Sequence, residues 1–186
     1  MGGCQNNMFV ILYNPGAGGD MVTAAIDKTD YMYTSTQITP FPNTLRSKIR
    51  LTSYDTDTNL IKTKKEELFV EASKKYIAIS EHNSSFFINS SHDIILIDDS
   101  NYINWTLDRV KKLDNFNKAD YHSRPTTVAG RLAWIDKHRK YTDKVITFDD
   151  IINGNLLTIL SRWVHTPLNE SWYTAWLKQR QKELQY

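Results

Sequence analysis

The chain has 186 residues, 40% of them apolar, with a formal net charge of +2 and one cysteine, Cys4. A chain of this length most simply forms one domain with a real core, so we expect a single domain over residues 1–186, with residues 1–7 frayed. The small net charge, spread along the chain, argues against a nucleic-acid partner. A lone cysteine and the lack of a long apolar run predict a cytoplasmic protein without a membrane partner.

The first apolar run leads directly into a glycine-rich turn. Residues 8–13 have the composition of a buried strand, residues 14–19 include one proline and three glycines, and residues 21–26 look helical. Glycines allow successive backbone amides to point inward, and the N-terminal end of the following helix adds attraction for an anion. We therefore predict a phosphate-binding turn formed by Asn14, Pro15, Gly16, Ala17, Gly18, Gly19, Asp20 and Met21.

This turn differs in chemistry from the usual nucleotide-binding loop, G-x-x-x-x-G-K-[ST]. Gly19 and Asp20 stand where the lysine and the Ser or Thr are expected. The lysine bridges the terminal phosphates and the hydroxyl helps to hold Mg²⁺, so Mg²⁺-dependent nucleotide hydrolysis is disfavoured. Backbone amides need no particular side chain, so the anion site remains, and Asp20 is expected to cap the following helix. The alternative is a strand–turn–helix junction that binds nothing.

Strand-like and helix-like segments alternate along the rest of the chain. Further apolar runs cover residues 76–80, 93–98 and 144–148, whereas helical spacing of apolar residues covers 58–75, 102–113, 125–140 and two segments after Asp149. This alternation predicts an α/β fold, a three-layer sandwich with a mostly parallel sheet joined by right-handed crossovers. Such sheets bind ligands at the carboxyl ends of their strands, where the glycine-rich turn lies.

The order of these elements resembles that of the P-loop sulfotransferases. The segment Tyr13-Asn-Pro-Gly-Ala-Gly-Gly-Asp20 is similar in placement to the family's donor-binding loop, with Pro15 and Gly18 on matching positions. The run of residues 76–82 ends in His82, as a family strand ends in a catalytic histidine. Residues 94–106 have the layout of the strand and the 3′-phosphate contacts, and residues 144–152 are similar to the closing strand with its acidic motif.

The resemblance implies a P-loop fold and the transfer of a sulfuryl group from 3′-phosphoadenosine 5′-phosphosulfate to a hydroxyl or amine, without a metal. The acceptor would be a small molecule or a carbohydrate. It also implies that the turn holds the 5′-phosphate, that His82 is the general base and that Thr106 contacts the 3′-phosphate. Gly16 replaces the family's loop lysine and Asp98 its arginine, so positive charge is expected from another side chain: Arg109, Arg124, or the pair Arg46 and Arg50.

His82 is also the best catalytic candidate on its own chemistry. An imidazole titrates near neutral pH, and a position just past the carboxyl end of a strand aims it into the ligand cleft. The alternative is a surface or capping histidine without a catalytic role. The other four histidines show no metal-ligand spacing, so we expect no metal.

Two other classes of function stay open. Asp98 and Asp99 follow an apolar strand, as does the carboxylate that organises Mg²⁺ in P-loop enzymes, which would fit a nucleotide or polyphosphate kinase. Because the loop hydroxyl is missing, a helix-capping or salt-bridging pair is the preferred interpretation of these two residues. The third class is a degenerate P-loop domain that serves as a non-catalytic binding or structural module. The sequence specifies neither the acceptor nor the oligomeric state.

Overall fold

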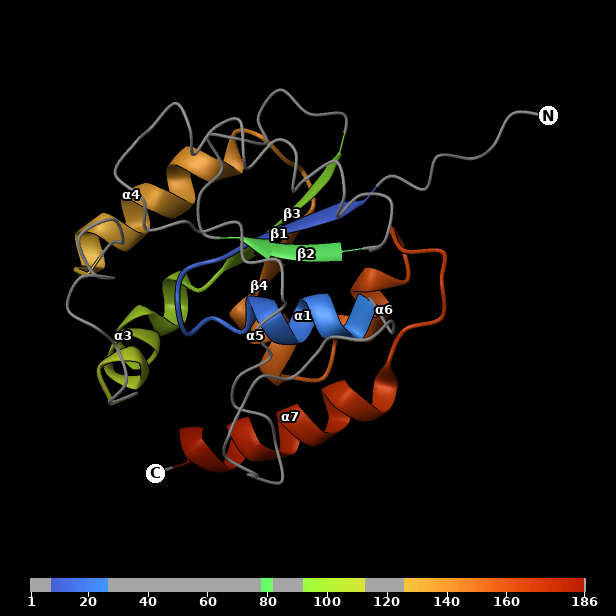
Figure 1. The fold of residues 1–186 in the computed structure, drawn as a ribbon. Helices are drawn as coiled ribbons and strands as arrows, with labels where there is room; N and C mark the ends of the chain where they lie inside the picture. The colour runs from blue at the N-terminus through green and yellow to red at the C-terminus, as the bar shows by residue number, and fades with distance from the viewer. Residues whose placement is uncertain (1–7, 27–77, 82–91, 113–125, 186) are drawn as a thin grey trace, which may run out of the picture.

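The structure, a computed structural model, describes residues 8–26, 78–81, 92–112 and 126–185. The strands in this part of the chain are β1 (Phe9–Leu12), β2 (Ala78–Glu81), β3 (Asp93–Asp98) and β4 (Val145–Thr147). They form one sheet in the order β2-β1-β3-β4, and every neighbouring pair is parallel (Figure 1). The predicted α/β class with a parallel sheet is therefore confirmed.

The helices alternate with these strands along the chain. They are α1 (Gly19–Ile26), the short 3₁₀ helix η1 (Ser100–Tyr102), α3 (Ile103–Lys112), α4 (Val128–Arg139), α5 (Phe148–Ile152), α6 (Leu156–Leu160) and α7 (Glu170–Leu184). In the described ranges, none of them combines the length and the apolar character that crossing a membrane requires.

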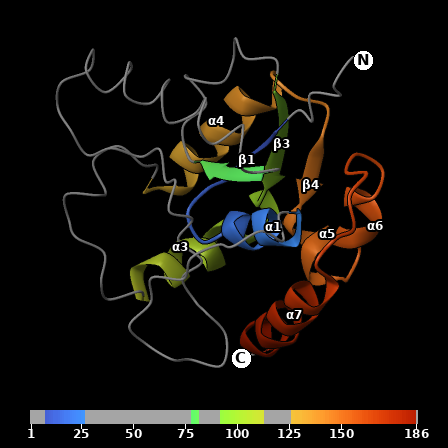
Figure 2. The same cartoon turned by 45° about the vertical axis from the view of Figure 1, so that its right-hand side comes forward.

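Helices pack against both faces of the sheet (Figures 1 and 2). Successive strand residues point to opposite faces, so Phe9 and Ile11 belong to one core cluster and Val10 and Leu12 to the other. The first cluster contains residues of α1, α5, α6 and α7, and the second contains residues of α3 and α4. All of β1 is buried, which explains its continuous apolar sequence, because both faces of this strand lie inside the protein.

The end of β4 differs from the sequence expectation. The run of residues 144–148 was expected to be one strand, but the strand ends at Thr147 and α5 begins at Phe148. Thr147 and Asp150 form a capping box in which each side chain accepts a hydrogen bond from the other residue's amide, at 3.1 and 3.2 Å. Gly154, with a φ of +87°, then separates α5 from α6. Three helices therefore follow β4 instead of two, and the expected helix of residues 58–75 lies outside the described residues.

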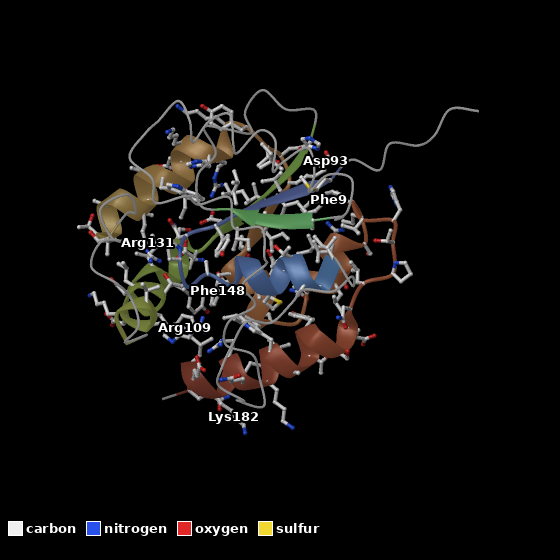
Figure 3. All side chains as sticks on the ribbon, viewed as in Figure 1. Phe9, Asp93, Arg109, Arg131, Phe148 and Lys182 are labelled. Carbon is white, nitrogen blue, oxygen red and sulfur yellow. The ribbon has the colours of Figure 1, made fainter. Side chains whose placement is uncertain are left out.

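The parallel register brings the carboxyl ends of three strands together. Leu12, the last residue of β1, pairs with Glu81 of β2 and with Leu96 of β3. Figure 3 shows Arg109 and Arg131 near this end of the sheet. The ligand sites of parallel sheets lie at such an edge, and the turn of residues 14–19 leaves β1 here.

Helix α4 carries a buried histidine close to its C-terminal end. The His138 ring stacks on Trp134 with 4.0 Å between the ring centroids, and its Nδ1 lies 2.6 Å from the Trp134 carbonyl oxygen. Nδ1 therefore carries the proton and donates it, while Nε2 is buried without a hydrogen-bond partner among the described residues. Burial lowers the pKa of His138; the bond to the Trp134 carbonyl opposes this shift, and the charge of Lys137 adds to it.

We expect the fold to lose stability as the pH falls below about 6.5. The unfolded chain binds a proton at the ordinary pKa of His138, whereas the folded protein binds it only at lower pH, so acid favours unfolding in that window. Urea unfolding at about pH 7.5 and about pH 5.5 measures the effect. His138→Asn, which keeps a donor for the Trp134 carbonyl, should lose less stability than the parent, with His165→Asn at an exposed histidine as the control. An equal loss in the parent and His138→Asn would contradict this assignment.

Candidate phosphate-binding turn

Residues 14–19, which we call the 14–19 turn, connect the carboxyl end of β1 to α1. Gly16 and Gly18 have φ values of +89° and +83°, a region that favours glycine. The Ala17 amide donates to the Asn14 carbonyl at 3.0 Å, and the Met21 amide donates to the Gly18 carbonyl at 3.0 Å. These bonds curl the chain tightly before the helix begins.

Three backbone amides of this turn have no acceptor within the described part of the chain. The nitrogens of Gly16, Gly18 and Gly19 donate to no acceptor among the residues that the structure describes. Gly19 is buried, and the other two glycines are partly exposed. Free N–H groups at the start of a helix attract anions, and a buried one is costly until an acceptor satisfies it. The turn therefore has the donors that a phosphate group needs.

Close packing explains why the turn contains glycine. A methyl group added at Gly16 would lie 2.8 Å from the Thr106 carbonyl oxygen, closer than a stable contact allows. One added at Gly19 would lie 2.1 Å from the Tyr13 ring. Helix α3 and the end of β1 thus press against the turn, and side chains larger than hydrogen do not fit at these two positions.

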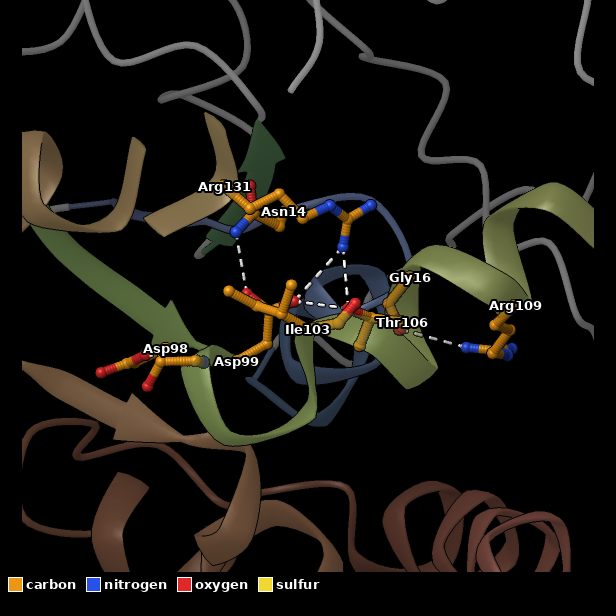
Figure 4. A network of polar contacts seen from close by, with 9 residues as sticks. Asn14, Gly16, Asp98, Asp99, Ile103, Thr106, Arg109 and Arg131 are labelled. Atoms are coloured by element: carbon orange, nitrogen blue, oxygen red, sulfur yellow. Dashed lines mark hydrogen bonds and ion pairs between the residues drawn. The ribbon is translucent and has the colours of Figure 1, made fainter. Parts of the chain in front are cut away.

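A buried polar network centred on Asp99 adjoins the turn (Figure 4). Asn14 Nδ2 donates to Asp99 Oδ1 at 2.8 Å, and the Thr106 hydroxyl donates to Oδ2 at 2.7 Å. Arg131 Nη1 donates to the same Oδ2 at 3.3 Å and to the Thr106 hydroxyl at 2.8 Å. All four side chains are buried, since each residue is at most 1% exposed. The network joins the turn, the end of β3, α3 and α4.

The negative charge of Asp99 is thus balanced inside the protein. A lone carboxylate in such a place is very unfavourable, and the Arg131 guanidinium together with two neutral donors offsets that cost. Asp98 likewise pairs with Arg139 of α4, so the salt-bridging interpretation of the two aspartates is confirmed. Both Asp99 oxygens already accept hydrogen bonds, and a Mg²⁺ ion would have to displace these donors.

Thr106 lies beside the turn, but its hydroxyl is already bonded. It donates to Asp99 and accepts from Arg131. The role at a 3′-phosphate that the resemblance implies for Thr106 stays a prediction, and it requires the hydroxyl to exchange one of these partners for the ligand. Of the other residues predicted for the site, Pro15, Ala17 and Met21 are buried. Asp20 lies in the first turn of α1, and only its backbone is described.

His82 lies outside the described residues. The preceding residue, Glu81, ends β2 and pairs with Leu12 of β1, so the chain leaves this strand at the edge of the sheet where the turn lies. The catalytic role of His82 stays a prediction from the sequence.

Arg109 of α3 places a positive charge beside the turn. Its Nη1 donates to the Gly16 carbonyl at 3.2 Å, and its guanidinium lies 5.6 Å from the centroid of the Trp105 ring. Burial lowers the pKa of Arg109 to about 10, with a further decrease from Arg180 and an opposing effect of Glu183. A guanidinium with this pKa stays charged at neutral pH. The other cations considered from the sequence lie outside the described residues: Arg46, Arg50 and Arg124.

Arg131 is a residue beside the candidate site that the sequence did not indicate. It lies in a helical segment with exposed neighbours, and its side chain is nevertheless 1% exposed. The sequence indicated such a residue only indirectly, because a buried aspartate that directly follows a strand needs a cation as its partner. Which arginine supplies it depends on how α4 packs on the sheet.

No protein-family model, curated protein or solved structure matches the chain. The resemblance to the P-loop sulfotransferases therefore rests on the sequence pattern alone. Within the described ranges, no group of three or more His, Cys, Asp or Glu side chains is placed to hold a metal ion.

Proposed function

We propose that the chain is a sulfotransferase-like P-loop domain that binds a phosphoadenosine donor. The backbone amides of the 14–19 turn would hold the 5′-phosphate of 3′-phosphoadenosine 5′-phosphosulfate. The observation that carries this proposal is that the amides of Gly16, Gly18 and Gly19, at the carboxyl end of β1, have no acceptor among the described residues. Phosphate oxygens are the acceptors that these donors lack, so the residues present fit this part of the donor.

The surroundings of Asp99 favour a reaction that does not depend on Mg²⁺. A phosphoryl-transfer enzyme of the P-loop type needs a loop hydroxyl and a carboxylate to hold the ion. Here Asp20 replaces the hydroxyl residue, and Asp99 is neutralised by Arg131. The missing loop hydroxyl and the occupied oxygens of Asp99 support sulfuryl transfer over the kinase alternative.

The donor, when bound, supplies the sulfuryl group that passes to a hydroxyl or amine of the acceptor. His82 is proposed as the base that takes the proton from that acceptor group, since imidazole is the side chain most often used for proton transfer near neutral pH. The small-molecule or carbohydrate acceptor would lie at the carboxyl edge of β1 and β2, where Leu12 and Glu81 end their strands.

A non-catalytic phosphate-binding module is the second candidate. It is favoured by the Thr106 hydroxyl, which is used inside the protein and offers nothing to a 3′-phosphate unless the network opens. Such a module would bind a 5′-phosphate at the turn without distinguishing 3′-phosphoadenosine 5′-phosphate from adenosine monophosphate. Comparison of these two ligands therefore separates the candidates.

We expect 3′-phosphoadenosine 5′-phosphate to raise the melting temperature in the presence of EDTA, with no further rise on adding Mg²⁺. At about 100 times its dissociation constant, a ligand adds about 2.7 kcal/mol to the stability of the folded state. His82→Ala should keep this stabilisation and lower the release of 3′-phosphoadenosine 5′-phosphate from the sulfated donor, measured over a panel of hydroxyl and amine acceptors, by about 100-fold. His165→Ala, at an exposed histidine, is the matched control.

The outcomes of this comparison are distinct. Stabilisation by ATP only with Mg²⁺ would favour the kinase, and equal stabilisation by adenosine monophosphate and 3′-phosphoadenosine 5′-phosphate would favour the binding module. If no adenosine phosphate stabilises the protein, the proposed donor site is wrong.

A further inference from the structure

Two arginines share one carboxylate beside the 14–19 turn. Arg109 of α3 and Arg180 of α7 both contact Glu183, which lies in the last turn of α7. Arg109 Nε lies 3.8 Å from Glu183 Oε2, and Arg180 Nη1 pairs with the same oxygen. One positive charge of this cluster is therefore left without a partner of opposite sign among the three side chains.

Arg180 is buried and only partly satisfied. The residue is 2% exposed, and its Nε has no hydrogen-bond partner among the described residues. Its guanidinium lies 5.4 Å from the centroid of the Trp176 ring, which fixes its position. Burial lowers the pKa of Arg180, and Glu183 opposes that shift. A buried, charged donor without an acceptor is unfavourable, and an added anion would remove that cost.

The arginine cluster is continuous with the turn. Arg109 Nη1 donates to the carbonyl of Gly16, and the Gly16 amide has no acceptor in the ranges that the structure describes. Trp176, which packs against Arg180, also approaches Gly18, where an added methyl group would lie 3.1 Å from the ring. Figure 3 shows Arg109 between the carboxyl edge of the sheet and the C-terminal part of α7. The cations and the free amides therefore lie side by side.

We propose that Arg109 and Arg180 form a second anion subsite next to the turn, and that the Glu183 carboxylate occupies it until a ligand displaces it. The ligand is of the class that carries two linked anionic groups, as in the pyrophosphate or phosphosulfate part of a nucleotide. One group would lie on the turn and the second on the two guanidinium groups. The Glu183 side chain is 35% exposed, so it can rotate into solvent when a ligand binds. The guanidinium groups of Arg109 and Arg180 are held in place by their contacts with the Trp105 and Trp176 rings. This inference rests on the proposed phosphate site and adds a subsite and an internal competitor to it.

Calorimetric titration with inorganic phosphate and with pyrophosphate, both in EDTA, tests the proposal. Pyrophosphate reaches both subsites and phosphate only the turn, so the parent should bind pyrophosphate more tightly. Glu183→Gln removes the competing charge and should tighten pyrophosphate binding about tenfold while changing phosphate binding less than about threefold. Arg109→Met should weaken pyrophosphate binding about tenfold. Arg109 is chosen because its side chain is partly exposed, so its loss is better tolerated than that of Arg180.

Asp108→Asn is the matched control for the change of charge. Asp108 precedes Arg109, is exposed and pairs with Lys111, so its removal alters the local charge without touching the arginine cluster. It should change pyrophosphate affinity by no more than about twofold. If Glu183→Gln and Asp108→Asn change the affinity for pyrophosphate equally while phosphate still binds, the arginine subsite is wrong and the proposed function of the turn is unaffected. Failure of the parent and every variant to bind either anion would overturn both the subsite and the proposed function of the turn.

Discussion

Replacing Arg131 by methionine is expected to lower the free energy of unfolding by about 3–5 kcal/mol. The side chains of Arg131 and Asp99 are 1% and 0% exposed, so loss of the guanidinium leaves a buried carboxylate without a counter-charge. Asn14 and Thr106 still donate to that carboxylate, but neutral donors offset only part of the cost. Urea unfolding followed by circular dichroism measures the loss.

The matched control for Arg131→Met lies on the same helix. Arg139 pairs with Asp98, and the two side chains are 52% and 5% exposed. Water screens the half-exposed guanidinium, and the Ser100 amide still donates to Asp98, so Arg139→Met should cost less than Arg131→Met, about 1–2 kcal/mol. Combining Asp99→Asn with Arg131→Met removes the buried charge as well and should restore about half of the lost stability or more. Equal costs for the two arginine variants would contradict the assignment of the Asp99 network as a buried anchor of the turn.

Gly16→Ala is expected to weaken phosphate binding by at least about tenfold and to destabilise the protein by about 2 kcal/mol. Gly16 has a φ of +89°, and the added methyl would lie 2.8 Å from the Thr106 carbonyl oxygen and 3.0 Å from Val110 Cγ2. The backbone of the turn must then shift, which moves its free amides out of alignment. Calorimetric titration with phosphate and urea unfolding measure the two effects.

Gly154→Ala separates the conformational cost from the loss of the site. Gly154 has a φ of +87°, almost the same as Gly16, but it lies between α5 and α6, and the nearest atom to an added methyl is Leu177 Cδ2 at 3.9 Å. We expect a stability loss of about 1 kcal/mol and unchanged phosphate affinity. If Gly16→Ala binds phosphate as tightly as Gly154→Ala does, the 14–19 turn is not the binding site.

The sheet was predictable because buried parallel strands have continuous apolar sequences. Residues 93–98 were expected as a strand and form β3 with the same bounds, and residues 8–13 contain β1. The end of β4 was not predicted, since Phe148 is buried in a helix as it would have been in a strand. The Thr147 and Asp150 pair that starts α5 has the spacing of a capping box and was the usable signal.

The turn was also predictable, because glycine and proline directly after a strand require an unusual backbone path. The network that supports it was not. Arg131 is four residues past its helix N-cap at Thr127 and has exposed neighbours, and only the packing of α4 on the sheet makes it the partner of Asp99. Thr106 was predicted from the resemblance as a 3′-phosphate contact, and it does lie beside Gly16. Its hydroxyl, however, is bonded within the Asp99 network, where it accepts from Arg131. Local sequence patterns locate the backbone donors, whereas long-range pairing decides which side chains surround them.

The amides of Gly16, Gly18 and Gly19 are proposed to bind phosphate without a metal ion. The most direct test is a titration of ¹⁵N-labelled protein with inorganic phosphate in EDTA, followed through the amide resonances of its seven glycines. We predict that these three resonances shift along one saturation curve, while that of Gly154, in the connection between α5 and α6, stays in place. If these three resonances do not move at phosphate concentrations up to about 50 mM, or if Gly154 responds and they do not, the amides of the turn are not the phosphate site.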